Sequence, residues 1–211
     1  MLRFAILELL HRKPLSGYDL KKRFAGSVGF FWRAKHSQIY PELRRLESEG
    51  LVTASRVPHE WRPTKKLYSI TAKGLEELVQ WLRERPELQA GKDEMMLKCF
   101  AFHLLDPAQA ADQIAHHRAL HLKRLDSHHE AERQVEARHG SLESTGDPIL
   151  FWNALTLHYA IAFEKTYIAW CDWALEQQRV FLERTASVDG VSRSGSGGVG
   201  SEHQKEEFAL S

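Results

Sequence analysis

The sequence predicts a mainly α-helical protein, with a small mixed domain at the N-terminus and a domain of long helices after it. Three observations support this fold class. Apolar residues recur at helical spacing along most of the chain, one segment of the first third alternates as β-strands do, and proline or glycine separates the segments. With 211 residues, 43% of them hydrophobic and 27% charged, the chain can bury a core and form two small domains.

Three helices are expected first. Pro14 stops the opening helix, and Ser16 with Asp19 forms a capping box for the second. Gly26 and Gly50 are residue types that commonly end helices, because glycine adopts the left-handed conformation there. The predicted helices cover residues 2–12, residues 16–24 and a segment from His36 or Ser37 to Gly50.

A β-hairpin and a fourth helix are expected to complete the first domain. Residues 51–57 are rich in β-branched side chains, and residues 66–70 alternate between polar and apolar, with turn composition in between. Thr71 can cap a helix that runs to about Arg85. We therefore expect the first domain to comprise residues 1–85, a reasonable size for an independent unit.

The remaining chain is predicted to be almost wholly helical. Asp106-Pro107 and Asp147-Pro148 each combine a capping aspartate with a proline at the first helical position. The first of the two helices that they open would be ~50 Å long at 1.5 Å per residue, too long for a domain of this size to cover, so we expect it to find a partner. The predicted limits are a linker at 86–92, a helical domain at 93–186 with helices over about 93–105, from Pro107 to about Arg138 and from Pro148 to about Arg184, and a disordered Gly/Ser-rich tail at 187–211.

The formal net charge of +1 hides a division between the two parts of the chain. Residues 1–85 hold 17 basic and 9 acidic residues, a net charge of +8, and the remainder has a net charge of −7. Such asymmetry indicates a nucleic acid or another anionic partner for the first part. DNA would repel the acidic part, which leaves the contact to the basic domain.

Three helices, a two-stranded ribbon and a fourth helix, in this order, describe a winged helix-turn-helix domain, whose third helix enters the DNA major groove. Serine and glutamine can read bases there, whereas arginine, lysine and tyrosine can hold phosphates. A basic helix by itself is more often a solvated surface, but the basic hairpin that follows favours DNA binding. The predicted DNA-contacting residues are Lys35, His36, Ser37, Gln38, Tyr40, Arg44, Arg62, Lys65 and Lys66.

Four blocks of sequence carry a resemblance to a known family. They are AILELL at 5–10, PLSGYDL at 14–20, SQIYPELRRLESEGLV at 37–52 and KLYSITAKG at 66–74. Together they resemble the PadR family of bacterial transcriptional regulators. The helical half, with its Leu-Asp-Pro turn and the segment LHYAIA at 157–162, looks like the AphA-like dimerisation domain of the longer PadR members.

This resemblance implies a homodimeric, ligand-responsive repressor that binds an inverted repeat of double-stranded DNA. The family's recognition helix maps to Ser37, Gln38, Tyr40 and Arg44, and its wing maps to the segment from Arg62 to Lys66. The acidic and bulky residues Glu60 and Trp61 in the wing turn depart from the family's pattern.

The last helix carries aromatic residues at steps of three and four. This spacing is typical of a buried core, because aromatic side chains bury a large area against neighbouring helices. The family resemblance also supports a pocket for a small, flat aromatic effector, although members differ in their effectors and no particular ligand is implied. The candidate effector-binding residues are Trp152, Tyr159 and Phe163.

Six histidines lie between residues 116 and 139. His117, His121 and His128 follow one helical face, and Glu132 continues it, so a surface metal site is conceivable. The step of seven residues spans two helical turns, too far for one ion without a neighbouring helix. A solvated or partner-facing coiled-coil surface is therefore favoured, and no metal or other cofactor is predicted.

No catalytic residues are predicted. Gly195-Ser-Gly-Gly-Val-Gly200 fits a dinucleotide-binding pattern, but no strand is expected before it and no helix after it. No segment approaches the ~18 apolar residues of a membrane span, no signal peptide is recognisable, and two cysteines suit a reducing compartment. We expect a cytoplasmic protein that is not an enzyme and has no membrane partner.

Two functions from different classes remain. The favoured one is a ligand-responsive DNA-binding regulator, a repressor that binds an operator palindrome as a homodimer. The alternative is a protein-interaction adaptor that uses the winged fold as a scaffold and dimerises through its long helices without reading DNA. The charge of +8 on the first domain favours the regulator, because an adaptor has no need of it.

Overall fold

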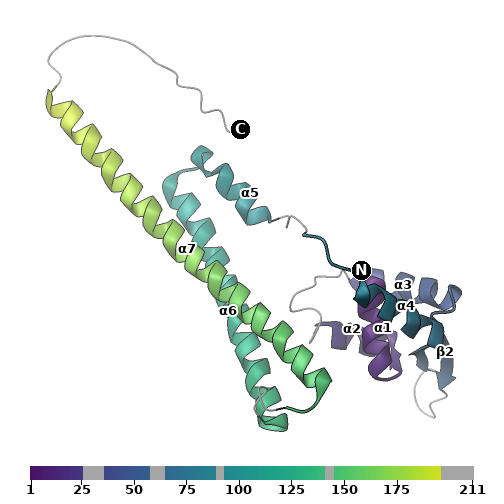
Figure 1. Ribbon diagram of the computed structural model, residues 1–211. Helices are drawn as coiled ribbons and strands as arrows, with labels where there is room; N and C mark the ends of the chain where they lie inside the picture. Colours follow the sequence, from purple (N-terminus) through teal and green to yellow (C-terminus); the bar gives the residue numbers. More distant parts are fainter. Residues whose placement is uncertain (26–35, 58–64, 89–92, 141–144, 196–211) are drawn as a thin grey trace. The chain divides into compact units, whose positions relative to one another are not determined.

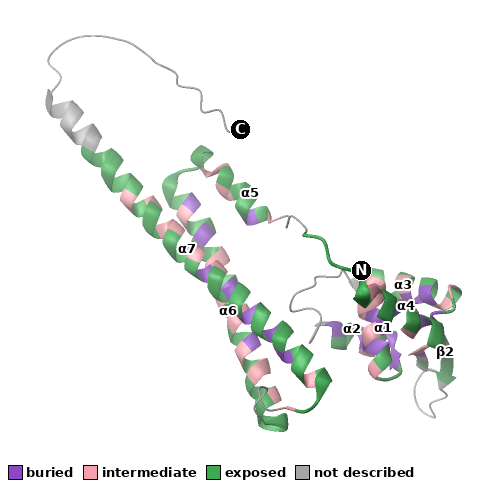
Figure 2. Cartoon of the chain, viewed as in Figure 1, coloured by how far each residue is buried: buried purple, intermediate pink, exposed green. Residues whose placement is uncertain are grey.

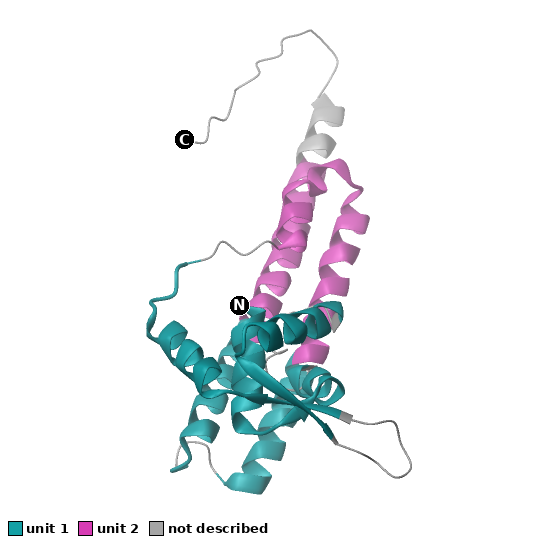
Figure 3. Cartoon of the chain, turned by 90° about the vertical axis from the view of Figure 1, so that its right-hand side faces the viewer, with its two compact units in different colours: residues 1–92, 125–163 teal, residues 93–124, 164–211 magenta. Residues whose placement is uncertain are grey.

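The computed structural model describes residues 1–25, 36–57, 65–88, 93–140 and 145–195 (Figure 1). The chain forms two compact units (Figure 3). The first unit contains residues 1–92 and 125–163, and the second contains residues 93–124 and 164–211. The grouping of residues 125–163 with the N-terminal residues was not predicted, and the predicted domain limits stay predictions.

The N-terminal part of the first unit combines helices with a three-stranded antiparallel sheet. Strand β3 lies in the centre, with β1 on one side and β2 on the other. The β2–β3 ladder runs from the pair Val52–Ile70 to the pair Val57–Lys65. The elements are α1 Leu2–Arg12, β1 Leu15–Ser16, α2 Gly17–Ala25, η2 His36–Gln38, α3 Ile39–Ser48, β2 Val52–Val57, β3 Lys65–Ile70 and α4 Ala72–Arg83.

This element order confirms the predicted three helices, hairpin and fourth helix. Strand β1 was missed because its two residues are too few for an alternating pattern. The predicted capping box is present, since Ser16 Oγ accepts a hydrogen bond from the amide of Asp19 at 3.2 Å and donates one to the Asp19 carboxylate at 2.8 Å. Gly50 has a φ of 74°, as expected of a residue that ends a helix.

One apolar core holds these elements together (Figure 2). Leucine or isoleucine side chains of this kind contribute about 1.5–3 kcal/mol each when they are fully buried. Phe4 of α1 also stacks on Trp81 of α4, with ring centroids 4.4 Å apart. The core therefore fixes the inner face of α3. Its buried apolar members are Ile6, Leu7, Leu9, Leu10, Leu15, Leu20, Phe24, Ile39, Leu43, Leu46, Leu51, Val52, Tyr68 and Leu78.

The rest of the described chain is helical. Asp106 and Asp147 cap the two long helices as predicted, each accepting a backbone amide at 2.8 Å. The predicted helix over 93–105 is interrupted at Ala101, where a 3-10 turn takes over. The prediction of an irregular tail from 187 is wrong up to Gly195, because the last helix continues to that residue, and residues 196–211 lie outside the described ones. The elements are α5 Glu94–Phe100, η3 Phe102–Leu104, α6 Pro107–His139 and α7 Pro148–Gly195.

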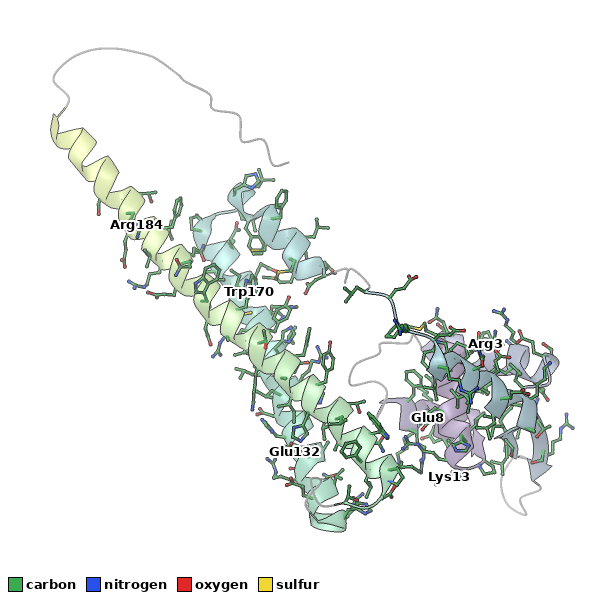
Figure 4. The ribbon with its side chains drawn as sticks, viewed as in Figure 1. Arg3, Glu8, Lys13, Glu132, Trp170 and Arg184 are labelled. Carbon is green, nitrogen blue, oxygen red and sulfur yellow. The ribbon has the colours of Figure 1, made fainter. Side chains whose placement is uncertain are left out.

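Helices α6 and α7 pair in antiparallel fashion. In the second unit, Arg118 forms an ion pair with Asp172, and in the first unit, Glu132 lies 3.5 Å from His158. A small core in the second unit contains Met95, Ile114 and Cys171, with Trp170 of α7 (labelled in Figure 4) among its partly buried members. Within the described residues, none of the helices is both long enough and apolar enough to cross a membrane.

Candidate nucleic-acid interface

Helix α3 has two chemically different faces. Its apolar side chains Ile39, Leu43 and Leu46 are at most 1% exposed and lie in the core. The opposite side chains are exposed, which confirms the predicted orientation of the helix. They are the hydrogen-bonding and basic residues Tyr40, Arg44 and Arg45, and Ser37 and Gln38 of the preceding 3-10 turn η2 are exposed as well.

The ring of Tyr40 lies against the first residue of helix α2. A Cβ atom added to Gly17 would overlap Cε1 of Tyr40 and lie only 3.0 Å from Cζ. Tyr40 is nevertheless 49% exposed, so its ring is supported on one side and open to solvent on the other. Gly17 therefore positions a predicted DNA-contacting side chain. Sequence reasoning missed this role, because no local pattern shows which side chain approaches a glycine.

Glutamates at the end of α3 bind several of the basic side chains. Glu49 forms ion pairs with Arg45, at 2.9 Å, and with Arg3 of α1, which Figure 4 labels. The hydrogen bonds from Arg45 and Arg3 lower the pKa of Glu49, so it is ionised at neutral pH. Arg45 is thus partly neutralised by its own chain. In the described part of the chain no ion pair involves Arg44, which leaves its guanidinium available to a phosphate.

Lys66 of β3 is also bound by a carboxylate. Its Nζ donates a hydrogen bond to Glu47 Oε2 at 2.8 Å, and this bond is the main reason why the pKa of Lys66 is raised. Lys66 was predicted to contact phosphate. To do so, its ammonium group must give up the hydrogen bond to Glu47 and bind a phosphate instead. The two residues are far apart in sequence, and only the pairing of the hairpin behind α3 brings them together.

Four of the predicted DNA-contacting residues are not placed as side chains. Lys35 and Arg62 lie outside the described residues. His36 begins η2 and Lys65 begins β3, so only their backbones are described. The described interface therefore consists of Ser37, Gln38, Tyr40 and Arg44, with Lys66 beside them in the same domain.

The candidate effector-binding residues lie on the outer face of α7. Trp152 is 65% exposed, Tyr159 62% and Phe163 43%, so the prediction that the aromatic stripe is core is wrong for these three residues in the single chain. Farther along α7, Tyr167 and Trp170 do pack against the small core of the second unit. The buried face of α7 is formed instead by smaller residues, including Ala154 and Ala160. An effector pocket among the three aromatic residues stays a prediction.

The prediction of a solvated or partner-facing histidine surface on α6 is wrong for two of the histidines, which are buried within the single chain, whereas His116 and His139 are exposed. His121 is 5% exposed and His128 3%. His121 contacts the carboxylate of Glu164, a residue of α7 that is completely buried. The helical spacing of the histidines was visible in the sequence, but their burial depends on how α7 packs on α6.

Comparison with known proteins relates both halves of the chain to characterised sequences. The sequence model of the transcriptional regulator PadR-like family matches residues 6–80, and that of the virulence activator alpha C-terminal region matches residues 91–179. The negative transcriptional regulator PadR of Bacillus subtilis is 34% identical over 178 residues, which cover 82% of this chain and 94% of that protein. A probable transcriptional regulator of Mycobacterium tuberculosis is 34% identical over 182 residues, with the same coverage of 82% and 94%.

Solved structures show the same relationship. The crystal structure of Bacillus subtilis PadR in complex with operator DNA matches with a TM-score of 0.72 at 34% identity, covering 84% of this chain and 98% of that one. The complex of that protein with p-coumaric acid matches with a TM-score of 0.66 at 35% identity, with the same coverage of 84% and 98%. The Vibrio cholerae virulence activator AphA matches with a TM-score of 0.66 at 26% identity, covering 86% of this chain and 99% of that one.

Proposed function

This chain belongs to the PadR-like family of transcriptional regulators, and from that premise we propose that it is a homodimeric, ligand-responsive repressor that binds an inverted-repeat operator in the cytoplasm. It has no catalytic role in this proposal. The observation that carries the proposal is the exposed face of η2 and α3, where Ser37, Gln38, Tyr40 and Arg44 project opposite a fully buried apolar face. A helix of this kind fits the major groove and presents hydrogen-bonding groups to base edges.

In this proposal the exposed side chains of η2 and α3 have different roles in DNA recognition. Ser37 and Gln38 supply groups that distinguish bases, whereas Arg44 and the hydroxyl of Tyr40 contact phosphate and fix the register. The excess of basic residues in the N-terminal domain draws the domain to DNA by a salt-dependent attraction. Two copies, related by two-fold symmetry, would place equivalent α3 helices on the two halves of a palindrome.

Dimerisation is supported by the exposed apolar side chains of α7. Trp152, Leu155 and Tyr159 are each at least 47% exposed, although large apolar side chains in such a row are costly to leave in water. The relative with p-coumaric acid bound supports an aromatic effector, and Trp152, Tyr159 and Phe163 remain the residues proposed to contact it. Effector binding would shift the operator affinity by favouring one arrangement of the two α3 helices.

Arg44→Ala is expected to weaken operator binding about tenfold, equivalent to about 1.4 kcal/mol. The log–log dependence of affinity on salt should lose a slope of about 1, because one phosphate contact disappears. The measurement is fluorescence anisotropy of labelled DNA across a salt series. The DNA is a fragment that the purified protein captures from its own genome.

The matched control is Arg133→Ala, which removes an exposed arginine from α6. It should bind the fragment as the unmodified protein does. If the folded dimer captures no DNA, or binds without any dependence on salt, the DNA-binding proposal is wrong and the adaptor function takes its place.

Glu47→Gln is expected to strengthen DNA binding a few-fold and to steepen the salt dependence by up to about 1, because Lys66 loses its carboxylate partner and becomes available to phosphate. Glu76→Gln removes the same charge from an exposed position of α4 and serves as the control. In a Lys66→Ala background the gain from Glu47→Gln should vanish. An equal gain in that background would mean that Glu47 does not act through Lys66.

A further inference from the structure

A buried carboxylate marks an unusual site in the second unit. Glu164 of α7 is completely buried, and one of its oxygens contacts Nδ1 of His121 on α6. Its other oxygen lies 2.9 Å from Nη2 of Arg124, also on α6. An ionised carboxylate is costly to bury without such partners. The proposed function does not use this cluster.

The contact with Glu164 favours one tautomer of His121. A carboxylate accepts a hydrogen bond, so Nδ1 of His121 carries the proton that points to Glu164. In the neutral imidazole, Nε2 of His121 then presents a lone pair. A buried carboxylate that holds one imidazole nitrogen and leaves the other as a donor to a metal ion is the usual arrangement behind metal-binding histidines.

A second imidazole faces that lone pair. His117 lies one helical turn before His121 on α6, and the two Nε2 atoms are 3.3 Å apart. Two nitrogen ligands of a tetrahedral zinc ion, each at ~2.0–2.1 Å from the metal, are about 3.3 Å apart. Histidines four residues apart on a helix are also a known zinc-binding pair. The spacing of the two nitrogens thus already suits one ion.

The surroundings hold the two rings and supply negative charge. The ring of Tyr167 stacks on His121, with centroids 3.9 Å apart and planes 10° apart. The hydroxyl of Tyr167 donates a hydrogen bond to Asp93 at 2.9 Å, which anchors the stacked ring. Burial alone would raise the pKa of Asp93, but the hydrogen bond from Tyr167 and those from two backbone amides lower it, and the nearby His117 contributes.

We propose that His117 and His121 bind one divalent transition-metal ion of the zinc type through their Nε2 atoms, with Glu164 as the residue that orients His121. The ion takes the place of the proton between the two Nε2 atoms, and His117 then carries its proton on Nδ1, so both imidazoles bind as neutral ligands. Among the described residues, no group of three or more histidine, cysteine or acidic side chains could hold a metal ion. Water or an external ligand completes the coordination, so the ion is exchangeable rather than structural.

The test is isothermal titration of the full-length, tag-free, chelator-treated protein with Zn²⁺. We expect one zinc ion per chain for the unmodified protein and no binding at this site for His117→Ala. His117 is only partly buried, so this variant keeps the fold, which far-UV circular dichroism verifies. His116→Ala, which changes the exposed neighbouring histidine, is the matched control and should bind as the unmodified protein does.

The variant Glu164→Gln tests whether Glu164 positions His121 for metal binding or only stabilises the fold. It keeps the shape of the side chain but removes the charge that orients His121, so zinc affinity should fall about 10–100-fold while the helix content is retained. With Co²⁺ as the probe, the visible absorption of a tetrahedral site should appear in the unmodified protein and be lost in His117→Ala.

Three results would overturn the proposal: no zinc binding by the unmodified protein, binding that survives His117→Ala, or binding that is removed by His158→Ala instead. The last result would place the ion beside Glu132, where His129 and His158 lie within 3.5 Å of the carboxylate. None of these results bears on DNA binding, which is measured independently.

Discussion

Gly74→Ala is expected to destabilise the N-terminal domain by about 3 kcal/mol, at the upper end of the usual cost of overpacking. A Cβ atom at this position would overlap the backbone oxygen of Leu51 and lie 3.0 Å from both Leu51 C and Ile70 Cγ1. The Leu51 oxygen cannot move freely, because it accepts the amide of Thr71 at 3.0 Å. Thr71 in turn caps α4 by accepting the amide of Gly74 at 3.0 Å. Relief of the overlap would therefore break the cap or the end of the β2–β3 ladder.

Urea unfolding followed by circular dichroism measures this loss, and hydrogen exchange assigns it to β2 and α4. The midpoint of thermal unfolding should fall by roughly 10 °C. Gly146→Ala is the control, since no atom lies within 4 Å of the position that its Cβ would take. If Gly74→Ala unfolds at the same urea concentration as the unmodified protein, the close approach of Gly74 to Leu51 is not required for stability.

Gly17→Ala is expected to lower operator affinity about tenfold, about 1.4 kcal/mol, with little change in stability. Alanine usually favours a helix over glycine, so the start of α2 itself tolerates the change. The added methyl group, however, occupies the space of the Tyr40 ring. Because that ring is half exposed, it can swing into solvent at low cost, but it then leaves the position from which it would contact DNA.

A double-mutant cycle tests whether Gly17→Ala lowers the operator affinity through the Tyr40 ring. In a Tyr40→Ala background the methyl group meets no ring, so Gly17→Ala should not reduce operator affinity any further. Anisotropy titrations of the unmodified protein, the two single variants and the double variant supply the four affinities. Additive losses would show that Gly17 acts through the backbone of α2 rather than through Tyr40.

The sequence alone determined the elements whose signals are local. Ser16 and Asp19, Thr71, Asp106 and Asp147 cap helices through hydrogen bonds to residues two or three positions away, so their role was visible in the order of residues. The periodic spacing of Ile39, Leu43 and Leu46 likewise determined which face of α3 is buried and which is open to DNA. Fold class and family membership followed from these signals and the blocks of sequence around them.

Helical periodicity did not identify the buried face of a helix that has two apolar faces. On α7 the aromatic row that includes Trp152 and Tyr159 is the more hydrophobic by inspection, yet the row with Ala154, Leu157 and Ile161 is the one that is buried. The large aromatic side chains of Trp152 and Tyr159 are left exposed. Helical periodicity identifies a face but does not say which of two faces a neighbouring helix covers.

Only the tertiary structure decided the contacts between residues that are distant in the chain. Glu47 binds Lys66 because the hairpin returns behind α3, the ring of Tyr40 meets Gly17 because α2 and α3 pack together, and Glu164 reaches His121 because α7 folds back along α6. The net charge of +8 in the first 85 residues was correct as a sum, but it counted Arg45 and Lys66 as available cations. Their pairing with glutamates is a property of the fold, because an ion pair depends on distance in space rather than on position in the sequence.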